Sequence, residues 1–348
     1  MTTLHAPAPV PAVASLRRSV SVRVAWLIAG IAILVVLAVA SVAFGVADVS
    51  PADLVAGLSG NATSIESAAV IKRMPRTVLA ILVGASLALA GASMQAVTRN
   101  PLADPGIFGV MSGAALAVVA GLAFFGIVDP YGQMGLAILG AAAAAIFVYA
   151  VGSLGRGGAT PLKLALAGAA TSAALASLVS AILLPRIDVM ATFRFWQIGG
   201  VGGAEWDRIA VVAPVLLIGA LIVLATARGL NSLALGDDLA AGLGEHVSRT
   251  RLISSAGAVI LCGAATAIAG PIAFVGLVIP HLVRLLVGPD HRWLLPLSAI
   301  GGAVLLLAAD IVGRLVAKPE EIEVGIVTAL IGAPVFIWIV RRQKVREL

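Results

Sequence analysis

The sequence predicts an all-α integral membrane protein with ten transmembrane helices and both termini in the cytoplasm. Three features predict this fold class: scarce charge, long uncharged windows, and the positions of Lys and Arg. Of the 348 residues, 60% are apolar before the 38 glycines are counted, and only 11% are charged. A soluble domain has about 45–50% apolar residues, glycine included, and about 25% charged residues. The uncharged windows also far exceed the ~10 residues of a barrel strand, which favours helices.

Nine uncharged windows are candidate membrane spans, because a helix needs about 20 residues to cross the bilayer. They cover residues 24–47, 77–98, 105–128, 130–155, 164–185, 209–227, 252–280, 293–309 and 324–340. The first window follows Arg17 and Arg18, as in a signal peptide, but it is too long for the apolar core of one. We therefore interpret it as the first spanning helix.

The seventh window is longer than a single span requires and contains Gly270-Pro271 near its middle. Proline lacks the backbone donor that continues a helix, so this pair favours a break into two helices. The second of these helices is expected to continue through Arg284 toward Gly288. The windows therefore give nine spans without the break, or ten with it.

The distribution of positive charge decides between nine and ten, because cytoplasmic loops are enriched in Lys and Arg. Basic residues at both ends of the chain place both termini in the cytoplasm, which requires an even number of spans: Arg17, Arg18, Arg23, Arg341, Arg342, Lys344 and Arg346. With ten spans, Lys and Arg are nearly twice as numerous inside as outside. The predicted organisation is a cytoplasmic tail at 1–23, a ten-helix domain at 24–340 and a cytoplasmic tail at 341–348.

Several kinds of chemistry are excluded by the sequence. No lysine follows a glycine, so the chain has no Walker A loop, and no HExxH motif is present. The single cysteine, Cys262, rules out a disulfide framework and a Cys-based metal site. The basic residues are dispersed rather than gathered on a face, which argues against nucleic acid. The sequence predicts no catalytic, cofactor-binding or metal-binding residue in this chain.

Asp310 is an ionisable residue deep in a predicted span, where charge is costly and often functional. Arg314 lies four residues later, so the two side chains share a helix face and can pair. This pattern leaves two interpretations open. Asp310 is either a proton relay of an ion-coupled secondary transporter or one half of a structural pair near the outer interface.

Two cytoplasmic segments are unusual for loops. Residues 98–106 form a proline-bounded turn between the second and third spans. In residues 235–244, the apolar positions follow a helical period and glycines lie at both ends, which predicts a short amphipathic helix. Its polar face is acidic and has no Lys or Arg, which disfavours anionic lipid and favours a protein partner.

Several motifs resemble the FecCD-type permease family of iron-siderophore and cobalamin ABC importers. They are RMPR at 73–76, Gly84-Ala85, residues 91–95, RNPLADPG at 99–106, AGPIAFVGLVIPH at 269–281, DHR at 290–292, Asp310 with Arg314, and GIVTALIGAP at 325–334. The resemblance extends from about residue 24 to 342. One departure is Glu323, near which the family usually has a proline, and it adds negative charge beside Glu320 and Glu321.

The resemblance implies a type II ABC importer permease with ten helices and cytoplasmic termini. It implies a second permease subunit, identical or a paralogue, with the pathway between the two. It further implies two cytoplasmic ATPase subunits that use ATP and Mg, an extracytoplasmic substrate-binding protein, and location in the bacterial cytoplasmic (inner) membrane. No cofactor is expected in this chain.

The resemblance also assigns roles to residues by position. Docking of the binding protein is expected at Arg73, Arg76 and Arg314. Coupling to the ATPase is expected at Leu235, Gly236, Asp237, Asp238, Leu239, Ala240, Gly242 and Leu243. The cytoplasmic gate is expected at Asn100, Pro101, Leu102, Thr160 and Pro161, and residues 164–184 are expected to line the pathway.

The expected function is the permease subunit of an importer of a ferric siderophore, working by alternating access that ATP hydrolysis in the partner drives. Residues 193–200 resemble a short outer segment of siderophore importers. Haem and cobalamin are the alternative cargoes. An ion-coupled transporter using Asp310 and an intramembrane enzyme are the alternatives from other classes, although no nucleophile and base stand out.

Overall fold

The computed structural model describes residues 19–101, 103–155 and 160–344, and these form helices with no β-strand within those ranges. The helices are α1 (Val20–Ala43), α2 (Pro51–Leu58), α3 (Ile65–Thr98), η1 (Pro105–Phe108), α4 (Val110–Phe125), α5 (Pro130–Gly152), α6 (Pro161–Leu183), α7 (Ile187–Ile198), α8 (Trp206–Ala225), α9 (Ala227–Leu233), α10 (Asp237–Gly242), α11 (Val247–Ala269), α12 (Val275–Val287), α13 (His291–Val316) and α14 (Val324–Lys344). Leu102, residues 1–18 of the predicted N-terminal tail and residues 345–348 of the predicted C-terminal tail lie outside the described residues.

Seven of the described helices are long and apolar enough to cross a membrane: α1, α3, α5, α6, α8, α11 and α13. Three shorter apolar helices, α4, α12 and the apolar part of α14, coincide with the other predicted windows. The predicted break at Gly270-Pro271 is confirmed, since α11 ends at Ala269 and α12 begins at Val275. Gly270 has a φ of +71°, a conformation that glycine adopts without the strain of a side chain.

The predicted window for the second span was too short at its outer end. α3 begins at Ile65 rather than at residue 77, because Ser64 caps it and its hydroxyl accepts the N–H of Ser67. Uncharged windows stop at Lys72, Arg73 and Arg76, whereas the helix continues through them. Sequence windows also missed α2, α7 and α9, which are short helices outside the predicted spans.

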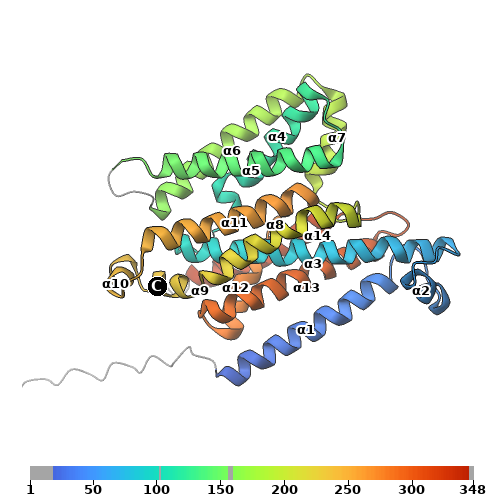
Figure 1. Ribbon diagram of the computed structural model, residues 1–348, viewed down its shortest axis with the longest axis horizontal. Helices are drawn as coiled ribbons and strands as arrows, with labels where there is room; N and C mark the ends of the chain where they lie inside the picture. Colours follow the sequence, from blue (N-terminus) through green and yellow to red (C-terminus); the bar gives the residue numbers. More distant parts are fainter. Residues whose placement is uncertain (1–18, 102, 156–159, 345–348) are drawn as a thin grey trace, which may run out of the picture.

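The helices form two groups (Figure 1). One group, here called the frame, consists of α3, α11, α12 and α13, with α1, α8 and α14 around it. The other, here called the lateral layer, consists of α4, α5, α6 and α7. The first described helix begins and α14 ends at the same end of the bundle, beside α10, while α2 and α7 lie at the opposite end.

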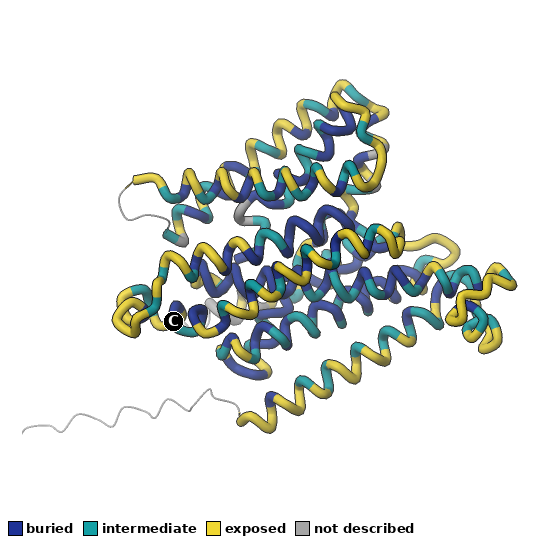
Figure 2. Tube along the Cα trace, in the orientation of Figure 1, coloured by how far each residue is buried: buried dark blue, intermediate teal, exposed yellow. Residues whose placement is uncertain are grey.

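The frame is organised around α3, where 78% of the spanning window is buried (Figure 2). Glycines permit this burial by letting neighbouring backbones come close. A Cβ added at Gly91 would lie 1.9 Å from the carbonyl oxygen of Gly276, and one added at Gly84 would lie 2.3 Å from that of Gly302. These contacts fix α3 against α12 and α13. By contrast, only 6% of the α1 window is buried, and its yellow outer side is exposed in Figure 2.

Candidate functional site

At the end of the bundle that carries α2, charged side chains of α3 and α13 meet in a cluster. Arg76 lies 2.8 Å from Asp310 and also contacts Glu321 at 2.6 Å. Arg314 lies 3.0 Å from the second carboxylate oxygen of Asp310, one helical turn away. The pair that the sequence predicted between Asp310 and Arg314 is therefore present. We call Arg73, Arg76, Asp310 and Arg314 the arginine cluster.

Arg73 and Arg314 extend this cluster to the end of α1. Arg73 donates hydrogen bonds to the carbonyl oxygens of Val42, Ala43 and Ala47, at 3.2, 3.0 and 2.7 Å. Arg314 donates to those of Ser41 and Phe44, at 3.0 and 3.1 Å. The last carbonyls of a helix have no partner within it. The two arginines supply these partners and tie α1 to α3 and α13.

The geometry bears on the docking role expected for these arginines. Arg73, Arg76 and Arg314 are only 7%, 9% and 1% exposed, and their donors are used inside the chain. Direct contact with another protein would require them to leave these partners. Their burial favours a structural role. The sequence indicated such a role for Arg314, four residues from Asp310, but not for Arg73 and Arg76, whose partners lie far away along the chain.

The cluster also bears on the alternative of ion coupling. Asp310 is 1% exposed and has a guanidinium close to each carboxylate oxygen. Arg76 and Arg314 each contact one of its carboxylate oxygens, so both oxygens are held by contacts within the chain. The geometry therefore favours the structural interpretation of Asp310 over the proton relay.

Beside the cluster, a cavity of about 140 Å³ lies where the two helix groups meet. Its walls include Trp196 of α7, Gly200 from the segment after α7, Arg208 of α8 and Glu323 before α14. Within the described part of the chain, Trp196 Nε1, Arg208 Nε and Glu323 Oε2 have no hydrogen-bond partner. Burial raises the pKa of the Glu323 carboxyl above its ordinary value, although Arg76 acts in the opposite direction.

At the other end of the bundle, the predicted amphipathic helix is present as α10. It is shorter than predicted because Gly236 (φ +108°) and Gly244 (φ +84°) turn the backbone on either side of it. Leu235, Leu239 and Leu243 are 56%, 63% and 69% exposed, whereas Ala240 is fully buried. An apolar patch exposed beyond the ends of the spans is typical of a protein interface.

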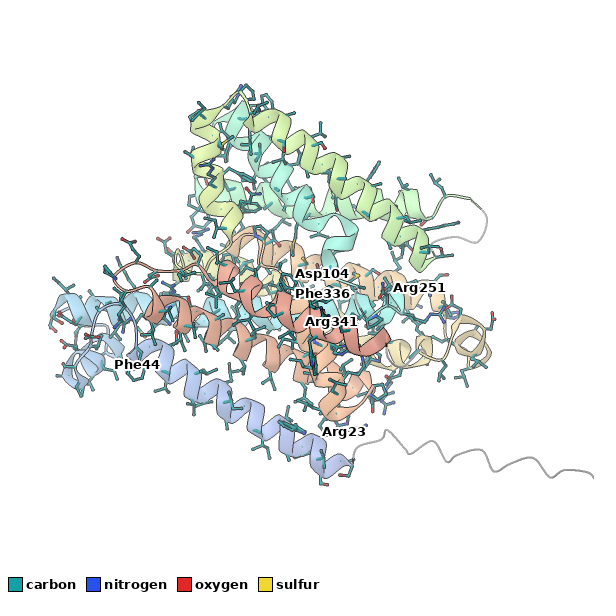
Figure 3. The ribbon with its side chains drawn as sticks, turned by 180° about the vertical axis from the view of Figure 1, so that it is seen from behind. Arg23, Phe44, Asp104, Arg251, Phe336 and Arg341 are labelled. Atoms are coloured by element: carbon teal, nitrogen blue, oxygen red, sulfur yellow. The ribbon has the colours of Figure 1, made fainter. Side chains whose placement is uncertain are left out.

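Asp237 of α10 connects this helix to the rest of the chain. Its carboxylate lies 3.0 Å from Arg251 of α11 and 3.4 Å from Arg99, the residue that follows α3. Figure 3 shows Arg251 at the end of the bundle opposite to Phe44. Sequence reasoning did not single out Arg99 or Arg251. The only signal was their position beside the two unusual cytoplasmic segments.

The structure places the described gate candidates at the ends of two helices. Asn100 and Pro101 follow α3, and the Asn100 carbonyl accepts the N–H of Ala103 at 3.1 Å. Thr160 caps α6, with its hydroxyl 3.4 Å from the N–H of Lys163, and Pro161 is the first residue of α6. Leu102 lies outside the described residues, so the full set cannot be compared.

The predicted pathway helix, α6, is exposed along much of its length, with 22% of its spanning window buried. It packs on α4, α5 and η1. Its exposed side carries small residues at helical spacing, namely Ala170, Ala174, Ser177 and Ala181. The Ser177 hydroxyl donates to the carbonyl of Ala173 at 2.9 Å. This surface suits close approach of another helix or of a bulky solute.

The described residues contain no group of three or more His, Cys, Asp or Glu placed to hold a metal ion.

Comparison with known proteins supplies the family. The chain is 45% identical over 328 residues to the ferric enterobactin transport system permease protein FepD of Escherichia coli. The alignment covers 93% of this chain and 98% of that protein. It is 44% identical to the iron(3+)-hydroxamate import permease FhuB of Bacillus subtilis, covering 91% and 83%. It is 40% identical to the hemin permease HmuU of Yersinia pestis, covering 78% and 82%.

A solved structure agrees with these relatives. A metal-chelate type ABC transporter in an inward-facing conformation superimposes with a TM-score of 0.80 and 31% identity, covering 92% of this chain and 99% of that one. Residues 33–342 match the FecCD transport family. The chain is a multi-pass helical membrane protein and belongs to the FecCD transport family.

Proposed function

We propose that this chain is a permease subunit of a bacterial ABC importer that carries a ferric siderophore across the cytoplasmic membrane. The observation that carries the proposal is the near full-length similarity to the ferric enterobactin permease. The exposed leucines of α10 support it, because a permease driven by a separate ATPase needs a cytoplasmic contact surface. Haem and cobalamin remain the alternative cargoes, since a hemin permease and a cobalamin permease are also similar.

The proposed topology has ten spans in one domain, 24–340, with both termini in the cytoplasm. The seven long helices and the three shorter apolar ones supply ten segments. The start of α1, the end of α14 and α10 lie at one end of the bundle, which is the cytoplasmic end in this proposal (Figure 1). The excess of Lys and Arg on that side supports the assignment.

In this proposal, α10 is the coupling helix for a cytoplasmic ATPase, which supplies ATP hydrolysis with Mg. Its contact surface includes Leu235, Leu239 and Leu243, and the coupling segment as a whole comprises these with Gly236, Asp237, Asp238, Ala240 and Gly242. Ala240 packs inward and fixes the helix on the permease. The exposed leucines then enter an apolar groove on the ATPase.

The transport pathway runs between this chain and a second permease subunit, with α6 on its wall. Small side chains on the exposed side of α6 leave room for a bulky chelate and bind it weakly. Asn100, Pro101, Leu102, Thr160 and Pro161 form the cytoplasmic gate. The binding protein delivers the cargo at the opposite end of the bundle. Arg73, Arg76 and Arg314 stabilise the surface at that end. An arginine that contacts the binding protein directly gives up its partners within the chain.

Reconstitution tests the proposal. The chain is purified with its ATPase and binding protein, placed in liposomes, and assayed for uptake of radiolabelled iron as a ferric siderophore, with haem and cobalamin in parallel. ATP-dependent uptake of the siderophore is expected. Leu239→Asp should abolish this uptake by placing a charge in the ATPase contact, while Leu239→Met should retain it. Uptake that follows a proton gradient without ATP would overturn the proposal.

A further inference from the structure

The two aspartates of α10 lie in different surroundings. Asp238 is exposed, in line with the leucines that face outward. Asp237 is only partly exposed, and its carboxylate contacts two arginines of the permease itself. One side of this short helix is therefore free for a partner, and the other is attached by charge to α3 and α11.

The attachment to α11 is the firmer of the two. Arg251 is buried, and its Nη2 group donates to both oxygens of Asp237, at 3.0 and 3.2 Å. A charge-assisted contact to both oxygens fixes the orientation of a carboxylate as well as its position. Arg251 therefore aims Asp237 at its second partner.

The second partner, Arg99, is the residue at which α3 ends. Its backbone is left-handed, with φ 49° and ψ 33°, so the chain changes direction at this residue and continues as Asn100-Pro101. The Arg99 guanidinium lies 3.4 Å from Asp237, and both side chains are 41% exposed. A pair with this exposure contributes little to the stability of the fold, so it can be removed without unfolding the chain.

The body of α3 just before Arg99 is held separately. Gln95 donates to the carbonyl oxygens of Gly276 and Leu277, each at 3.2 Å. Its own side-chain oxygen accepts from Arg284 of α12 at 3.1 Å. Because α3 is fixed to α12 at Gln95, displacement of Arg99 moves the turn that follows rather than the whole helix.

From these contacts, we propose that Asp237 is a positioning residue that transmits movement of α10 to the turn after α3 through Arg99. The inference rests on the proposed function, because it takes α10 as the contact of the ATPase. When the ATPase displaces α10, Asp237 carries Arg99 with it and moves Asn100-Pro101. Loss of the pair leaves the ATPase bound and active but separates hydrolysis from transport.

The test measures two rates in one preparation, the full complex of permease, ATPase and binding protein in liposomes. Arg99→Asn removes the charge at a left-handed position that asparagine tolerates. It should raise the number of ATP molecules hydrolysed per iron imported by about fivefold, the effect of losing a pair worth at most a modest coupling energy. Asp237→Asn should raise the same ratio.

Matched controls distinguish transmission of movement through the Asp237–Arg99 pair from a merely structural role of these residues. Arg249→Asn removes an exposed arginine charge from α11, outside the coupling segment, and should leave the ratio unchanged. Arg99→Lys should restore it. If Asp237→Asn fails to fold because Arg251 loses its partner, Arg99→Asn decides alone, since it keeps the Asp237–Arg251 pair.

An Arg99→Asn ratio equal to that of Arg249→Asn, or a fall in hydrolysis and uptake together, would overturn the inference. A wild-type complex with no ATP-dependent uptake would instead refute the proposed function, and with it the inference that the Asp237–Arg99 pair transmits movement.

Discussion

The frame and the lateral layer differ in how much of their surface is buried by other parts of the same chain. In the frame, α3 and α11 are mostly buried, glycines bring backbones together, and buried charges are paired. In the lateral layer, α6 exposes most of its length, and a crevice of about 340 Å³ lies between α5 and α11. The chain itself covers most of α3 and α11 in the frame, whereas it leaves most of α6 in the layer exposed.

This difference assigns different tasks to the two groups. A transporter needs a part that keeps its shape and a part whose contacts change during the cycle. Interfaces that open and close cannot carry buried ion pairs, because separating such a pair leaves an uncompensated charge. The ion pairs of the frame and the small, uncharged side chains on the exposed side of α6 match these two tasks.

The largest effect is expected in the frame, from Asp310→Asn. The substitution leaves Arg76 and Arg314 buried without their shared carboxylate, which should cost about 3–5 kcal/mol of unfolding free energy. Unfolding of the purified chain in detergent, followed by circular dichroism, measures the loss. Glu320→Gln, at an exposed position of the same end, should change stability by no more than about 0.5 kcal/mol. A loss below about 1 kcal/mol for Asp310→Asn would mean that the cluster does not hold the frame together.

The lateral layer should respond in the opposite way to Ala174→Leu. This position is exposed on α6, so the larger side chain should alter the stability of the isolated chain by no more than about 0.5 kcal/mol. Uptake in the reconstituted complex should nevertheless fall, because leucine fills space needed by the second permease or the cargo. Ala174→Ser, which stays small, should transport normally. Normal uptake by Ala174→Leu would show that this side of α6 faces lipid.

Sequence alone was sufficient for features that are encoded locally. The break at Gly270-Pro271 was predicted because proline and glycine act on their own backbone, and α10 because glycines bound a short periodic segment. The start of α3 was missed because Lys72, Arg73 and Arg76 ended the uncharged window. Arg73 and Arg76 are accommodated in the helix because their side chains contact residues distant in sequence, such as Val42 and Asp310.

Dependence on residues distant in sequence also limited what could be predicted about the candidate site. The resemblance identified Arg73, Arg76 and Arg314 as notable positions, but their burial depends on the packing of α1 against α13. Arg99 begins the RNPLADPG motif and Arg251 lies in no motif. Neither position indicated a contact with Asp237, because that contact exists only once α3, α10 and α11 are assembled.

The smallest effect is expected where the two groups join, at Glu323. Here the N–H of Gly200 donates to the carbonyl oxygen of Ala269 at 2.8 Å, and the N–H of Gly325 donates to that of Gly199 at 3.0 Å. The segment after α7 is therefore bound to the frame beside the cavity.

Burial raises the Glu323 pKa, so the folded state favours the protonated acid. Its stabilising contribution is present below the ordinary pKa of 4.5 and is lost as the pH rises through the raised value. Glu323→Gln should therefore unfold at a higher temperature than wild type at neutral pH, with the difference disappearing toward pH 4.5 and below. Glu320→Gln removes the same charge outside the cavity and serves as the control. A wild type more stable than Glu323→Gln at neutral pH would mean that the ionised carboxylate and Arg76 stabilise this part of the frame as a pair.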